Sequence, residues 1–100
     1  MKTGLITPCP RTGEDLYGKY AHLMCEYREL VEAWKNWEEE QKDKKRLADV
    51  VEEAIDLATS CMTLIDELEK ISGVDKLADN ALLMVAAKTY IRGYHSTPMI

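Results

Sequence analysis

The stretch KYAHLMCEYRELVEAWKNWEEEQKDKKRLADVVEEAIDLATSCMTLIDELEKIS, residues 19–72, decides the fold. It contains neither glycine nor proline, the residues that mark the turns of β proteins and that helix interiors avoid. The chain is therefore predicted to be all-α.

Within this stretch, apolar residues recur at alternating spacings of four and three, which is typical of one face of a helix. The first stripe consists of Leu16, Tyr20, Leu23, Tyr27, Leu30, Trp34 and Trp37. Its continuation would bury Gln41 and Lys44, and residues 38–46 are almost wholly charged. The chain is therefore expected to turn near Gln41.

A second stripe begins in a new phase and consists of Leu47, Val51, Ala54, Ala58, Cys61, Ile65 and Leu68. This helix carries further apolar residues outside the stripe, so we expect it to be the central helix, buried on more than one side. The pair Ser72-Gly73 predicts its end, and an apolar-rich third helix is expected over 74–91. About three main helices then form an antiparallel bundle, and their surplus apolar surface predicts completion by homo-oligomerisation.

The chain has 100 residues and is predicted to hold a single all-α domain over 12–93. Thr12 and Asp15 are spaced like a capping box at its start. Residues 1–11 are expected to form an extended arm and residues 94–100 a tail.

The composition of the chain bears on its binding partners and on its location in the cell. A net charge of −5 argues against binding to nucleic acid polymers. No apolar run approaches the roughly 20 residues of a membrane helix, so a soluble protein is expected. Three cysteines without paired spacing favour the cytoplasm.

Acidic residues embedded in the two apolar helices are the candidates for chemistry. Glu26 and Glu29 are spaced i, i+3, and so are Glu53 and Asp56, which puts each pair on one side of its helix. Folding back about Gln41 brings position 29 opposite 53 and position 26 opposite 56. The four carboxylates are expected to meet at one level, although Asp56 lies nearly opposite its own apolar stripe.

Four converging carboxylates repel one another unless they are protonated or neutralised by a cation. All-oxygen sites suit Mg²⁺ or Mn²⁺. The alternative is that these residues are ordinary solvated acids on helix surfaces. His22 and His95 have no partner at ligand spacing and are expected to be surface residues, while Trp34 and Trp37 are expected in core or oligomer contacts.

The acidic residues also carry a family resemblance. The segment CEYRELVEA, residues 25–33, followed by EAID, residues 53–56, resembles the split motif EExxE and ExxD of the MazG-like all-α nucleoside triphosphate pyrophosphohydrolases. The resemblance covers residues 16–94. Cys25 replaces the first glutamate of the motif, and since it points further from the apolar stripe than Glu26, we expect the loss of an outer contact rather than of a metal ligand.

The resemblance implies cleavage of a nucleoside triphosphate to a monophosphate and pyrophosphate. It implies that Glu26, Glu29, Glu53 and Asp56 hold Mg²⁺, with Glu29 and Glu53 as candidates for the base that accepts a proton from water. Lys88 and Arg92, spaced i, i+4, resemble the family's basic residues and would bind the polyphosphate.

Three alternatives stay open at this point. Lys88 and Arg92 also suit a simple role at the negative end of a helix dipole. The chain could be a non-enzymatic helical interaction protein, or a degenerate relative that binds nucleotide and metal without turnover. The homo-oligomer is expected to be a dimer or a tetramer.

Overall fold

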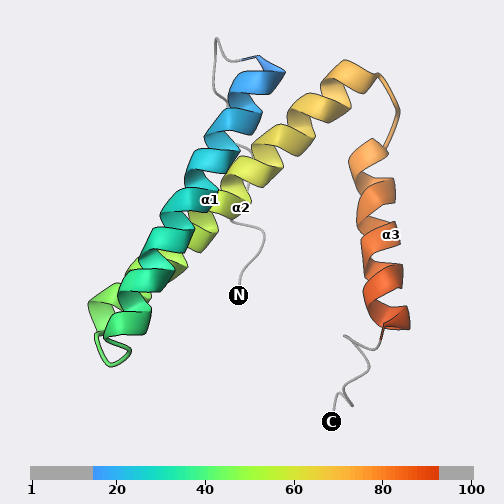
Figure 1. Cartoon of the computed structure of the whole chain (residues 1–100). Helices are drawn as coiled ribbons and strands as arrows, with labels where there is room; N and C mark the ends of the chain where they lie inside the picture. Colours follow the sequence, from blue (N-terminus) through green and yellow to red (C-terminus); the bar gives the residue numbers. More distant parts are fainter. Residues whose placement is uncertain (1–14, 93–100) are drawn as a thin grey trace. The chain divides into compact units, whose positions relative to one another are not determined.

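The computed structural model describes residues 15–92. Three helices occupy this part of the chain: α1 (Leu16–Glu39), α2 (Lys44–Ser72) and α3 (Leu77–Ile91) (Figure 1). No strand occurs among the described residues, which confirms the all-α class. None of these helices combines the length and apolar character that crossing a membrane requires.

Helix α1 begins with Asp15 as its N-cap. The Asp15 carboxylate accepts a hydrogen bond of 2.7 Å from the backbone N–H of Gly18, one of the unpaired donors of the first helical turn. Asp15 is thus the N-cap itself, and Thr12, the other residue of the predicted capping box, lies outside the described residues.

The predicted turn near Gln41 is confirmed, since residues 40–43 separate α1 from α2. Asp43 starts α2 by accepting hydrogen bonds from the backbone N–H groups of Lys45 and Arg46, at 2.9 and 3.3 Å. Arg46 then spans the turn, because its guanidinium donates to the carbonyl of Asn36 at 2.8 Å. The two helices consequently run antiparallel as one hairpin.

The end of α2 also follows the sequence pattern. Gly73 adopts a φ of 65°, the left-handed conformation that commonly ends a helix and that glycine adopts without strain. Helix α3 starts at Leu77, three residues later than predicted. The Glu69 carboxylate accepts a 2.8 Å hydrogen bond from the backbone N–H of Ala78 and so supplies the missing side-chain cap of α3.

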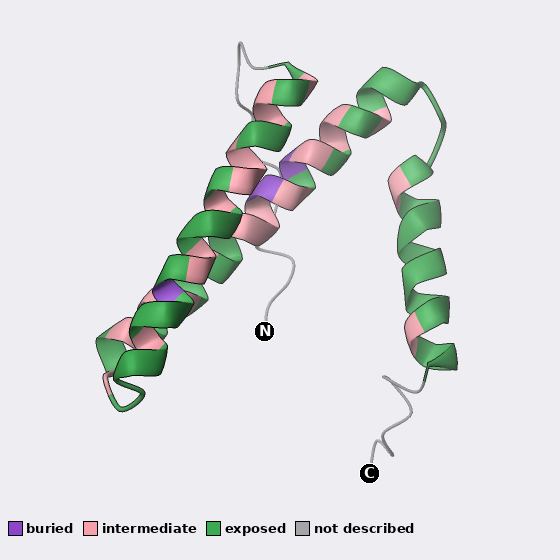
Figure 2. Ribbon diagram, in the orientation of Figure 1, coloured by how far each residue is buried: buried purple, intermediate pink, exposed green. Residues whose placement is uncertain are grey.

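The described chain forms two compact units, one ending at Leu68 and the other beginning at Glu69. The first contains the α1–α2 hairpin, and the second contains the last turn of α2 and α3. Almost every residue of α3 is exposed, although most of its residues are apolar (Figure 2). The predicted arm 1–11 and tail 94–100 lie outside the described residues, and the single domain over 12–93 stays a prediction.

The faces on which α1 and α2 meet differ from the predicted stripes. The α1 contact face is centred on Leu23, Glu26, Leu30, Ala33 and Trp37 and so keeps only part of the first stripe. On α2 the inward positions are Val50, Glu53, Leu57, Ser60 and Leu64, whereas most of the second stripe is exposed. Burial of α2 on more than one side stays a prediction.

Few side chains are buried between α1 and α2. The buried residues in the described chain are Ala33, Ser60 and Thr63, and no large side chain there is fully buried. A half-buried ion pair between Lys19 and Glu67, at 3.1 Å, ties the open end of the hairpin. The interface between α1 and α2 thus contains both polar and apolar contacts, and the carboxylates of Glu26 and Glu53 lie midway along it.

Candidate functional site

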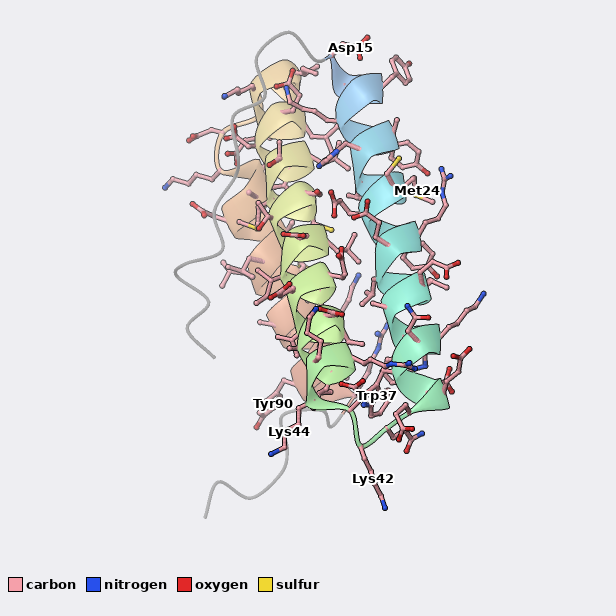
Figure 3. All side chains as sticks on the ribbon, turned by 90° about the vertical axis from the view of Figure 1, so that its left-hand side faces the viewer. Asp15, Met24, Trp37, Lys42, Lys44 and Tyr90 are labelled. Atoms are coloured by element: carbon pink, nitrogen blue, oxygen red, sulfur yellow. The ribbon has the colours of Figure 1, made fainter. Side chains whose placement is uncertain are left out.

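Three of the four predicted metal ligands converge in the hairpin. One carboxylate oxygen from each of Glu26, Glu53 and Asp56 lies within 4.8 Å of the other two. Glu26 comes from α1 and the other two from α2, and Figure 3 shows oxygen-bearing side chains between the two ribbons. The antiparallel pairing expected from the turn position thus places these groups together.

Two carboxylate oxygens in this cluster are buried without a hydrogen-bond partner, namely Oε2 of Glu26 and Oε2 of Glu53. A buried oxygen of this kind is costly, because it has lost water without gaining a donor. Burial, reinforced by the nearby negative charge of Glu29, raises the pKa of Glu26 and also that of Glu53. Both observations describe a site that gains stability from a positive charge.

Glu29 lies outside the group of three but remains part of the site. It is exposed on α1, and its charge acts on both Glu26 and Glu53. The fourth predicted ligand is therefore close enough to repel the cluster, at a position more open to solvent.

His22 makes a contact that the sequence analysis did not anticipate. Its Nε2 atom lies 3.3 Å from Oε1 of Glu26, one helical turn away. The positive form of this histidine lowers the pKa of Glu26 and so opposes the effect of burial. The i, i+4 spacing of His22 and Glu26 is the feature of the sequence that indicates this contact.

An open pocket of about 720 Å³ adjoins the carboxylates. Glu29 and Glu53 form part of its wall, together with Arg28, Glu32, Ala33, Asn36, Arg46 and Asp49. Its size falls within the range of small-molecule sites. The pocket therefore offers space beside the cluster for a ligand with hydrogen-bonding and charged groups.

Most of the residues that line this pocket were not predicted from the sequence. Arg46 is the last residue of the charged segment 38–46, and Asp49 lies between Leu47 and Val51 of the second apolar stripe, so neither residue was a candidate. Their positions relative to Glu53 at intervals of seven and four residues place them on the same side of α2. That spacing is the one feature of the sequence that could have identified them.

The remaining candidates lie elsewhere. Lys88 and Arg92 are exposed at the end of α3, in the second unit, and their binding of polyphosphate stays a prediction. Cys25 is exposed, whereas Glu26 is half-buried, as expected from the helical geometry. The rings of Trp34 and Trp37 lie 5.0 Å apart, with Trp34 exposed and Trp37 half-buried near the turn (Figure 3).

Comparison of the chain with protein-family models, with curated proteins and with solved structures finds no match. Glu26, Glu53 and Asp56 supply only oxygen ligands, which hard divalent cations such as Mg²⁺ prefer. The two unpartnered buried oxygens fit such a cation.

Proposed function

We propose that this protein is a Mg²⁺-dependent nucleoside triphosphate pyrophosphohydrolase that releases a nucleoside monophosphate and pyrophosphate. The observation that carries the proposal is the convergence of Glu26, Glu53 and Asp56 with two unpartnered buried oxygens. The resemblance of residues 25–33 and 53–56 to the MazG-like motifs supplies the reaction class.

In this proposal Glu26, Glu53 and Asp56 hold the cation, and Glu29 completes the set from its solvent side. Mg²⁺, or Mn²⁺ in its place, would neutralise phosphate charge and lower the pKa of a coordinated water. Glu29 and Glu53 line the pocket, which supports the proposal that one of them accepts a proton from an attacking water.

Basic and polar side chains are proposed to bind the polyphosphate, the sugar and the base of the substrate. Lys88 and Arg92 remain the proposed contacts for the polyphosphate, because a substrate with about four negative charges needs positive partners. Arg46 and Asn36 border the pocket beside the carboxylates. Their donors suit the sugar or base of a nucleotide.

The proposal includes a homo-oligomer, a dimer or a tetramer, and a cytoplasmic location. The thin packing of the hairpin and the exposed apolar side chains support self-association. The described cysteines, Cys25 and Cys61, are free, which suits a reducing compartment.

The same exposed apolar surface supports a second candidate, a helical interaction protein without catalytic activity. The two functions differ in what they require of the carboxylates. A surface acid that only maintains solubility can be replaced by glutamine without consequence, whereas a metal ligand cannot.

The test is an incubation of the purified protein with a panel of canonical and modified nucleoside triphosphates and Mg²⁺, with pyrophosphate and phosphate measured separately. Glu53→Gln is compared with Glu52→Gln, a change of the same charge at the neighbouring exposed position. We expect pyrophosphate release by the wild type and by Glu52→Gln, and its loss in Glu53→Gln. Absence of pyrophosphate from every nucleotide, or equal release by both variants, would overturn the proposal.

A further inference from the structure

The two carboxylate oxygens of Glu26 have different surroundings. Oε1 lies 3.3 Å from Nε2 of His22, at the long end of the range for a hydrogen bond. Oε2 is buried and has no hydrogen-bond partner in the described part of the chain. A side chain of the same helix therefore engages one oxygen of Glu26, and the other oxygen is left without a donor.

Holding the Glu26 side chain in this position has a cost. Its charge lies close to the charges of Glu29 and Asp56, and burial has removed water from its carboxylate. Fixing a glutamate side chain also costs rotamer entropy, which the side chain regains if it turns out toward solvent. A donor on Oε1 offsets these costs and keeps the carboxylate between the helices.

His22 is well placed to supply this donor. The i, i+4 spacing puts it one turn before Glu26 on the same side of α1, and the two side chains are 28% and 14% exposed. The pair Lys45 and Asp49 has the same spacing on α2, but its side chains are 80% and 40% exposed, so water competes for that contact. The contact of His22 with Glu26 is shielded from water and restrains the carboxylate more strongly.

His22 is not one of the three residues whose ligand atoms converge. Groups of this kind, which bind a ligating carboxylate without touching the metal, orient the ligand and typically change metal affinity by about 10–100-fold when they are removed. A neutral imidazole with its hydrogen on Nε2 is sufficient for this role, because it donates to a carboxylate without carrying a charge.

We infer that His22 is a positioning residue of the cation site: its imidazole holds Oε1 of Glu26 and so leaves Oε2 available to the cation. The inference rests on the cation site of the proposed function and adds to that site a residue that the proposed cleavage does not use.

The test is Mn²⁺ binding by the full chain, measured by electron paramagnetic resonance, with two substitutions that separate the donor of His22 from its bulk. His22→Phe keeps an aromatic ring and lacks the donor, whereas His22→Gln keeps an N–H donor near the position of Nε2 and lacks the ring. We expect His22→Phe to bind Mn²⁺ at least about tenfold more weakly than the wild type, and His22→Gln to recover most of this loss. The control Lys35→Ala removes an exposed side chain on the opposite side of α1 from Glu26 and should bind like the wild type.

Circular dichroism of each variant separates a change at the site from loss of helix. If His22→Phe loses its helices, His22→Leu takes its place with the same expected result. Binding by His22→Phe equal to that of the wild type, absence of recovery in His22→Gln, or equal weakening by Lys35→Ala would overturn the inference.

These results are distinguishable from a failure of the proposed function. Equal binding by the wild type and His22→Phe overturns the role of His22 and leaves the cation site intact, whereas a wild type that binds no Mn²⁺ overturns both. Weaker binding by His22→Phe with recovery in His22→Gln, in a protein that releases no pyrophosphate from any nucleotide, would support the role of His22 and reject the cleavage.

Discussion

Removing the charge of Glu53 should stabilise the metal-free protein. Its carboxylate lies in a cluster whose oxygen atoms are within 4.8 Å of one another, and one of its own oxygens is buried without a partner. Glu53→Gln keeps the shape of the side chain while removing its repulsion from Glu26 and Asp56. Folding then no longer has to bring this charge into the cluster.

The size of the effect follows from Coulomb's law. Two like charges 4.8 Å apart repel by about 0.9 kcal/mol in a medium like water and by about 3.5 kcal/mol at an effective dielectric constant of 20. Because Asp56 is exposed, the weaker figure applies to its pair with Glu53. The same figure, taken as the minimum for the less exposed pair with Glu26, brings the gain to about 1–2 kcal/mol. In a domain of this size, that gain raises the melting temperature by roughly 5–10 °C.

The assay is thermal and urea unfolding in the presence of a chelator, followed by circular dichroism, with Glu52→Gln as the control. The control should remain within about 0.5 kcal/mol of the wild type, since its side chain is exposed outside the cluster. Added Mg²⁺ should then raise the melting temperature of the wild type and leave that of Glu53→Gln almost unchanged. A Glu53→Gln variant no more stable than the control would refute the claim that the carboxylates repel one another in the folded state.

Three further predictions follow from the hairpin. The stability advantage of Glu53→Gln should depend on pH. Folding raises the pKa of the Glu53 carboxyl above its usual 4.5, so the folded protein binds the carboxyl proton more tightly than the unfolded chain does. The stability of the wild type therefore falls as the pH rises through that raised pKa. Unfolding at several pH values should therefore show the full advantage at pH 7 and none well below pH 4.5, and an advantage that is constant with pH would contradict this explanation. Asp15→Ala should cost about 1 kcal/mol in urea unfolding, because the N–H of Gly18 loses its acceptor, and an unchanged midpoint would exclude a capping role. Lys19→Met should destabilise the protein by about 1–3 kcal/mol, because Glu67 loses this half-buried partner. The double variant Lys19→Met with Glu67→Leu should recover much of the lost stability. A double variant as unstable as Lys19→Met alone would argue against a stabilising ion pair.

The sequence predicted the helices and the turn because these depend on local chemistry. Residues 19–72 lack glycine and proline, which favours helix throughout this stretch. The charged segment before Asp43 interrupts the apolar pattern at the turn, and Gly73 ends α2. Each of these signals depends only on residues close to it in the sequence. The position of the turn then fixed which residues oppose each other across the hairpin. That pairing brought Glu26, Glu53 and Asp56 together.

The orientation of the helices could not be predicted in the same way. A periodic apolar stripe shows which side of a helix avoids water, but it does not say whether the covering partner is the next helix or another molecule. In this hairpin the inner seam includes Lys19, Glu26 and Glu53, whose polar contacts replace part of the apolar packing. Asp56, nearly opposite its apolar stripe, reaches the cluster because that stripe is not the surface that meets α1.

The central claim is that the carboxylates of the hairpin form a site for a divalent cation, and a titration with Mn²⁺ followed by electron paramagnetic resonance tests it most directly. The free-ion signal should fall with one equivalent of Mn²⁺ bound per chain in the wild type and in Glu52→Gln, and excess Mg²⁺ should restore it. Glu53→Gln should leave the signal of free Mn²⁺ undiminished. Binding by Glu53→Gln equal to that of the wild type, or no binding by the wild type, would contradict the claim.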